Sequence, residues 1–351
     1  MKNLFNYRSL LTGFIIITLF WACKKDHTPP KLFNISQTNL VADTVGFGAA
    51  KIDPNLANAW GIAAAPSGPI WISANHTGLS PIYDTTGKTL RAPIIVPSAT
   101  PGEGGAPTGQ IFNSTTDFNG AKFIFAGEDG TISSWAGGNA ATIVADKSQT
   151  RAIYKGLTMA SDNGSNFLYV ANFKGRKIDV FDKNFNYVTD KPFADALIPS
   201  DFGPFNIQNI NGELYVTYAK LKAPDNEDDD SGLGHGFVDI YSTNGTMLKR
   251  FASLGSLNSP WGVALAPAGF CNDKQTILIG NFGDGRINIF DMQGNYKGQL
   301  QNNGHVISID GLWAIDFLKN NKPGGNPNGP LYFTAGPADE SHGLFGALQK
   351  H

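Results

Sequence analysis

The sequence contains few charged residues and few cysteines. Charged residues make up 16% of its 351 positions, and the chain has two Cys in all. Two Cys exclude a scaffold held by several disulfides and a metal cluster built on several thiolates. The 27 basic residues nearly balance the 29 acidic ones, so the chain has no excess of positive charge that would attract nucleic acid. We therefore expect no nucleic-acid partner.

The sequence also lacks a hydrophobic run long enough to cross a membrane. Its longest apolar run, residues 10–22, has ~13 residues, whereas a membrane-spanning helix needs roughly 20. The run follows the basic residues Lys2 and Arg8, and a basic leader before a short apolar segment is typical of a signal peptide. We predict that residues 1–22 are such a peptide.

The end of this run points to a lipid anchor. Ala22 and Cys23 are followed by Lys24, Lys25 and Asp26. A small residue before Cys resembles the lipobox of bacterial lipoproteins, in which the Cys becomes the lipidated N-terminus, and a Cys-Lys-Lys-Asp start resembles surface lipoproteins of Bacteroidetes-type bacteria. The resemblance implies lipidation of Cys23, a tether over residues 23–32 and a place in the outer membrane of the cell envelope, facing the cell surface. The alternative is that Cys23 merely ends the hydrophobic segment.

What the sequence has in quantity is glycine, with 41 residues, and apolar residues, with 41% of the chain. This apolar fraction is enough for a large core. No window repeats apolar residues at helical spacing, so we expect few helices. Instead, short apolar and aromatic strands recur six times at intervals of about 50 residues. These units open at residues 59–62, 108–111, 156–159, 204–207, 261–264 and 312–315.

A repeat of this length, made of short strands and Gly-rich turns, is typical of a β-propeller blade. After residues 344–348 the last unit has too few residues for a fourth strand, whereas residues 33–41, upstream of the first unit, alternate like a strand. We predict an all-β fold over residues 33–351, a six-bladed β-propeller. The N-terminal strand would complete the last blade, which closes the ring and hides its sheet edges.

Two stretches resemble NHL-type propeller repeats, namely residues 168–182 and 277–291. More broadly, residues 35–349 resemble a family of bacterial six-bladed propellers that are secreted or anchored at the envelope, with much of the similarity in residues 60–62 and 259–264. The resemblance implies the six-bladed propeller fold, and it implies that this chain is a lipoprotein member of that family. It implies no reaction.

Two sets of residues are candidates for ligand binding. Asn75, Asn172 and Asn281 end the second strand of the odd-numbered units only, which suggests a pseudo-threefold ring of amides at one mouth of the channel. The alternative is that these side chains shape tight turns. Trp60, Trp261 and Trp313 open the innermost strands. They would either pack between blades or form an aromatic rim at the channel mouth.

A metal site is a further expectation. Gluconolactonase-like propellers hold a divalent cation centrally through carboxylate and amide oxygens, and such oxygens suit Ca²⁺. Glu128, Asp129, Asp284 and Asp310 stand at predicted turns or strand starts, although they do not match that family's ligands one by one. The densest acidic run, residues 225–232, lacks the spacing of a calcium-binding loop, and we expect it to be a solvated loop.

No nucleophile elbow or paired His motif is present in the sequence. We therefore expect a monomeric envelope lipoprotein whose propeller is a platform for a glycan, peptide or protein partner. The alternative is a metal-dependent enzyme of lactonase or lyase type with a cation in the central channel. Whether the chain is an enzyme stays open at this point.

Overall fold

In the computed structural model, residues 32–66, 68–318 and 326–351 are described, together with Met1. Cys23 and most of the predicted signal peptide and tether lie outside the described residues. Within these residues, no helix is long and apolar enough to span a membrane.

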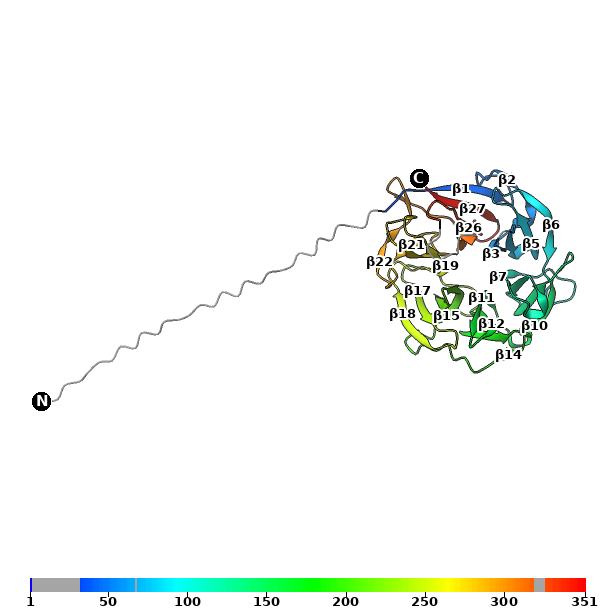
Figure 1. Ribbon diagram of the computed structural model, residues 1–351, viewed down its shortest axis with the longest axis horizontal. Coiled ribbons are helices and arrows are strands. Elements are labelled where there is room, and N and C mark those ends of the chain that lie inside the picture. Colours follow the sequence, from blue (N-terminus) through cyan, green and yellow to red (C-terminus); the bar gives the residue numbers. More distant parts are fainter. Residues whose placement is uncertain (2–31, 67, 319–325) are drawn as a thin grey trace. The chain divides into compact units, whose positions relative to one another are not determined.

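Six antiparallel sheets surround a central axis (Figure 1), so the predicted six-bladed β-propeller is confirmed. In each blade the first-named strand lies nearest the axis. Blade one has β3 (Ala59–Ala64), β4 (Ile70–Ala74), β5 (Leu79–Tyr83) and β6 (Thr89–Ile95); blade two has β7 (Pro107–Phe112), β8 (Phe123–Gly127), β9 (Thr131–Trp135) and β10 (Thr142–Asp146). Blade three has β11 (Tyr154–Asp162), β12 (Ser165–Asn172), β13 (Lys177–Asp182) and β14 (Tyr187–Val188).

Blade four has β15 (Phe202–Ile210), β16 (Glu213–Lys220), β17 (Gly236–Tyr241) and β18 (Met247–Ser253); blade five has β19 (Pro260–Ala266), β20 (Thr276–Asn281), β21 (Ile287–Phe290) and β22 (Tyr296–Gln299). A short hairpin of β23 (Gln301–Asn302) and β24 (His305–Val306) follows. Four 3₁₀ turns lie wholly within the described residues: η1 (Pro54–Leu56), η2 (Asn75–Thr77), η3 (Phe118–Gly120) and η4 (Ser148–Thr150).

Blade six closes the ring as the sequence predicts. It is built from β25 (Leu312–Asp316), β26 (Leu331–Ala335) and β27 (Leu344–Lys350), and β1 (Ile35–Ala42) pairs antiparallel with β27 along its whole length. The strand β2 (Lys51–Ile52) adds a short parallel pairing outside β1. The side chains of Ile35, Val41 and Ala42 are fully buried, so the N-terminal strand contributes to the core as well as to the sheet.

All six innermost strands carry a β-bulge near their first residues, where the register against the second strand shifts. A bulge places two residues opposite one and turns a side chain away from the regular alternation. The residues at or beside the bulges are Trp60, Thr108, Lys155, Phe205, Trp261 and Trp313. In four of the six strands, glycine follows: Gly61, Gly109, Gly156 and Gly262.

Glycine is required in at least one of these places because the inner strands approach closely. A Cβ atom on Gly156 would lie 2.1 Å from Oδ1 of Asn206 on the neighbouring inner strand. A larger residue there would displace the buried side chain of Asn206, which donates a hydrogen bond of 2.8 Å to Trp261 O. The six inner strands leave a cavity of about 30 Å³ along the axis, which has room for one or two water molecules rather than a ligand.

Aromatic rings fill the axis beside the bulges. The rings of Trp60 and Trp313 stack with centroids 3.7 Å apart, and Phe282 stacks on the other side of Trp313 at 4.0 Å. Trp261 meets Trp313 edge to face at 5.9 Å. Trp60, Trp261 and Trp313 are buried. Their rings therefore pack in the core between blades, and they do not form an exposed aromatic rim.

Candidate functional site

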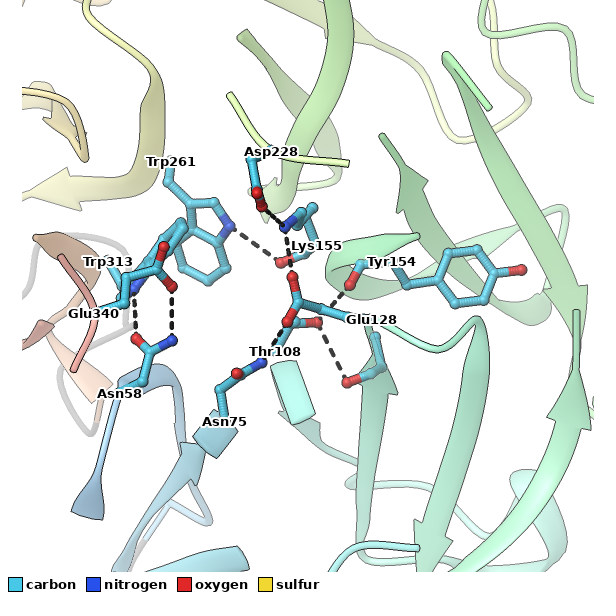
Figure 2. A network of polar contacts seen from close by, with 11 residues as sticks. Asn58, Asn75, Thr108, Glu128, Tyr154, Lys155, Asp228, Trp261, Trp313 and Glu340 are labelled. Carbon is cyan, nitrogen blue, oxygen red and sulfur yellow. Dashed lines mark hydrogen bonds and ion pairs between the residues drawn. The ribbon is translucent and has the colours of Figure 1, made fainter. Parts of the chain in front are cut away.

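The candidate site lies at the mouth of the channel where the inner strands begin. Because the second strand of each blade runs antiparallel to the first, it ends at the same mouth. Lys155 lies in β11, Asn75 follows β4 and Glu128 follows β8. Figure 2 shows these side chains converging from three different blades.

Lys155 is the centre of the network. Its side chain is 3% exposed, and its Nζ lies 2.5 Å from Oε1 of Glu128 and 3.5 Å from Oδ1 of Asp228. Nζ also stands 5.2 Å from the centre of the Trp60 ring. Burial alone would lower the pKa of Lys155, but the carboxylates of Glu128, Asp228 and Glu340 outweigh burial and raise it. The ammonium is therefore a fixed positive charge.

Glu128 is held from both sides. One carboxylate oxygen pairs with Lys155, and the other, Oε2, accepts a hydrogen bond of 2.8 Å from Nδ2 of Asn75 (Figure 2). Asn75 opens η2 and is buried. Two separate donors thus fix the orientation of this carboxylate, which gives the mouth a rigid pair of opposite charges.

Glu340 is a second carboxylate at the mouth, in the connection between β26 and β27. It accepts a hydrogen bond of 2.6 Å from Nδ2 of Asn58, whose Oδ1 in turn accepts one of 3.1 Å from Nε1 of Trp313. Burial raises the pKa of Glu340, and the carboxylates of Glu128 and Asp228 raise it further. Lys155 and Asn58 oppose them, and the pKa reaches about 7. Glu340 can therefore exchange a proton near neutral pH.

The backbone that carries Glu340 is strained. Residues 338, 339 and 340 have φ of 56°, 50° and 63°, a run of left-handed conformation without glycine. Each such residue costs roughly 1–2 kcal/mol. Strain of this kind persists where the surrounding structure imposes it and is common at ligand sites.

The acidic run forms a strap over the mouth, and we call residues 221–232 the acidic strap. Backbone bonds join Lys222 N to Asp228 O at 2.9 Å and Asp230 N to Lys220 O at 2.8 Å. Side chains of the strap pair with Lys155, with Lys174 and with Lys220. The expectation of a solvated loop is only partly right. Asp225 and Asp228 are exposed, but burial raises the pKa of Asp229, which accepts a hydrogen bond from Ser259.

The other predicted amides do not join this network. Nδ2 of Asn172 donates to Asp179 at 2.8 Å within blade three. Nδ2 of Asn281 donates to Ser256 O and to Oδ1 of Asp284, at 2.8 and 3.0 Å. Asn75 alone of the three contacts the Lys155 network, so the three amides do not form one ring of contacts.

The four predicted metal ligands contact separate partners. Glu128 binds Lys155, and Asp129 accepts hydrogen bonds from Ala99 N and Thr131. Asp284 binds Asn281, and Asp310 accepts from Ala338 N at 2.9 Å. Across the described ranges, no group of three or more His, Cys, Asp or Glu side chains is placed to hold a metal ion. These four residues therefore do not fit a shared calcium site.

Sequence reasoning missed Lys155, Asn58 and Glu340. One signal was available for Lys155: it precedes Gly156 as Trp60 precedes Gly61 and Trp261 precedes Gly262. Aligning the units on the residue before the glycine would have placed Lys155 among the residues that face the mouth. Asn58 and Glu340 have no such signal, because they lie in connections rather than in the repeated strands.

Comparison with known proteins supports the fold and places the chain in a family. No family model matches the chain. A streptogramin B lyase structure aligns with a TM-score of 0.53 at 14% identity, over 91% of this chain and 98% of that one. A putative gluconolactonase gives 0.54 at 13%, over 91% and 94%. At these identities the likeness concerns the fold alone.

In sequence, the chain is 34% identical over 326 residues to "Uncharacterized protein L690" of Acanthamoeba polyphaga mimivirus, covering 86% of this chain and 82% of the relative. This similarity spans most of both chains. The chain belongs to the same family as the mimivirus protein L690.

Proposed function

We propose that the protein is a ligand-binding propeller of the cell envelope, and that the mouth around Lys155 is its ligand site. The observation that carries the proposal is the burial of the Lys155 side chain, paired with the partly exposed Glu128, at the channel mouth. Burying a charged side chain costs desolvation free energy that an ion pair repays poorly as stability, so a structural role alone gives little reason for placing a lysine there. Titratable groups with perturbed pKa values are typical of functional sites, and Lys155 and Glu340 are two such groups.

The mouth offers both kinds of hydrogen-bonding partner. Lys155 donates, while the carboxylates of Glu128 and Glu340 accept from hydroxyl or amide groups. Their positions are set by Asn75 and Asn58 before a ligand arrives. Such a preorganised polar set suits a glycan, a peptide or an exposed segment of a protein partner, since less ordering is needed on binding.

The location rests on the sequence. Cys23, directly after the predicted signal peptide, would carry the lipid and make the protein an outer-membrane lipoprotein exposed at the cell surface. Membership of a bacterial lipoprotein family with NHL-like repeats belongs to the same proposal, because the relatives compared above are viral.

The second candidate is a propeller enzyme of lactonase or lyase type. Its support is Glu340, whose pKa of about 7 suits a proton acceptor next to a fixed ammonium. The names of the solved structures similar to this fold include a lyase and a putative gluconolactonase. Because the four expected calcium ligands do not converge, we derive no step through a metal. Metal content of the purified protein, with and without chelator, tests that part of the candidate.

Binding to glycan and peptide arrays tests the first proposal. The full-length protein in detergent should give defined positives, and the affinity for each should fall at least tenfold in Lys155→Met and in Glu128→Gln. Lys88 is exposed and lies outside the network, so Lys88→Met serves as the matched control and should bind as the parent does. Equal affinity in the parent and both mouth variants would place the ligand site elsewhere.

A further inference from the structure

The two carboxylates that pair with Lys155 are held very differently. Glu128 is 27% exposed, lies 2.5 Å from Nζ and is also bound by Asn75. Asp228 is 71% exposed and lies 3.5 Å from Nζ. In the part of the chain that the structure describes, Lys155 is its only side-chain partner. Glu128 is therefore a fixed partner of the ammonium, whereas Asp228 is an exchangeable one.

The acidic strap does not depend on the side chain of Asp228. Its backbone is held by a bond to Lys220 O, from Asp230 N, and by a bond within the strap, from Lys222 N to Asp228 O. Glu227 binds Lys174 at 2.6 Å, Asp230 binds Lys220 at 3.0 Å, and Asp229 is bound by Ser259. Rotation of the Asp228 side chain would therefore free one face of Lys155 while the strap stays in place.

The ring of Trp60, which carries a donor without an acceptor in the described part of the chain, lies near the ammonium of Lys155. Trp60 is 1% exposed, its ring centre is 5.2 Å from Nζ of Lys155, and its Nε1 has no hydrogen-bond partner among the described residues. A buried N–H without an acceptor costs roughly 1–3 kcal/mol. A group with two acceptor oxygens could satisfy both the ammonium and a neighbouring donor.

Charge balance identifies the group that fits. Lys155 lies among Glu128, Asp228 and Glu340. A cationic ligand would be repelled by the ammonium, and a doubly charged anion would be repelled by the fixed carboxylates. A single carboxylate that replaces Asp228 leaves the charge around Lys155 unchanged. Burying a charge is tolerated only when its compensation is kept.

We propose that Asp228 occupies, in the free protein, the place of a carboxylate that the ligand brings to Lys155. The proposal rests on the proposed function, because it names the ligand class of the same mouth. Glu128 and Glu340 offer acceptor oxygens beside that place, and hydroxyl groups are the donors that they would take. The ligand is therefore a sugar acid, such as a uronic acid unit of a glycan. The C-terminal carboxylate of a peptide is the competing source.

The test compares galacturonate, galactose and N-acetylalanine as probes of the full-length protein, with tryptophan fluorescence and calorimetry as readouts. Galacturonate should bind at least tenfold more tightly than either other probe. Asp228→Asn should bind galacturonate about two- to fivefold more tightly, because an exposed ion pair no longer competes. Asp225→Asn makes the same charge change at an exposed strap residue and should bind as the parent does. Lys155→Met should lose at least tenfold, and thermal melting checks that each variant folds.

Three results would overturn the inference: galactose binding as well as galacturonate, N-acetylalanine binding more tightly, or no gain in Asp228→Asn. These failures are distinguishable from failure of the proposed function. If an array ligand without a carboxylate depends on Lys155 and Glu128, the mouth is the site and only the ligand class is wrong. If substitution of neither residue changes the affinity for the array ligands, the assignment of the mouth as the ligand site is wrong.

Discussion

Lys155 shows how a single residue can set the properties of the whole mouth. An isolated ammonium in a protein interior is unfavourable by several kcal/mol unless partners compensate it. Here Glu128 and Asp228 supply the compensation, and each of these two carboxylates has Lys155 as its ion-pair partner. Each member of the cluster is therefore sensitive to loss of the others.

Replacing Lys155 by Met should destabilise the protein by about 3–5 kcal/mol at pH 8, because Glu128 and its neighbours lose their counter-charge. Urea unfolding followed by circular dichroism measures this. The double variant Lys155→Met, Glu128→Gln should recover part of the loss. Lys88→Met should change the unfolding free energy by less than about 0.5 kcal/mol. A loss below 1 kcal/mol in Lys155→Met would show that the cluster is not coupled as described.

Glu340 predicts a dependence of stability on pH. Its pKa rises from 4.5 when unfolded to about 7 when folded, so the native state keeps a proton that the unfolded state has released. Stability contributed by this group is therefore complete below about pH 4.5 and is lost as pH rises through 7. Gln cannot ionise, so Glu340→Gln should be about 2–3 kcal/mol more stable than the parent at pH 8. The two should agree at pH 4.

Comparing the pH dependence of stability in the parent and in Glu340→Gln separates the contribution of Glu340 from that of other titratable groups. Burial, which outweighs Arg250, raises the pKa of Asp239 to about 6, and its titration is common to both proteins. Urea midpoints at several pH values between 4 and 8 give the measurement. Parallel curves for the parent and Glu340→Gln would mean that Glu340 titrates at its ordinary pKa.

At the scale of elements, the strands could be predicted from the sequence, but the set of side chains that converge at the channel mouth could not. Each blade repeats a local pattern of apolar strands and glycine turns, so the number of blades and the closing strand follow from short segments read one at a time. The mouth joins Asn58, Glu128, Lys155, Asp228 and Glu340, which come from five blades. No sequence spacing encodes that convergence. It appears only when the ring is closed and every inner strand carries its bulge.

The strand β1 should be essential for the stability of the closed ring. Deleting residues 31–42 removes three fully buried side chains and leaves β27 as an exposed edge. The loss should be on the order of 5 kcal/mol and should lower the melting temperature markedly. Deleting residues 24–30 leaves β1 whole and is the control. A deletion of residues 31–42 that melts like the intact protein would contradict ring closure by β1.

At the scale of the whole molecule, the predicted anchor determines where the propeller acts. Replacing Cys23 by Ser removes the atom that would be lipidated, so the protein should leave the membrane fraction, because stable anchoring of such a chain depends on its acyl groups. Cell fractionation and immunoblotting measure the distribution. Cys271, the other Cys, is buried in the propeller, and Cys271→Ser should stay with the membrane. Retention of Cys23→Ser would refute the lipoprotein proposal.

The pairing of β1 with β27 has a consequence for biogenesis. A ribosome makes Ile35 early and its partner Lys350 more than 300 residues later, a delay on the order of 15–60 seconds at ordinary rates of translation. Throughout that interval β1 lacks its antiparallel partner β27, and the last blade cannot form. A nascent chain of this protein therefore exposes the edge of β1 that later pairs with β27, and a chaperone that shields this edge would act before termination rather than after it.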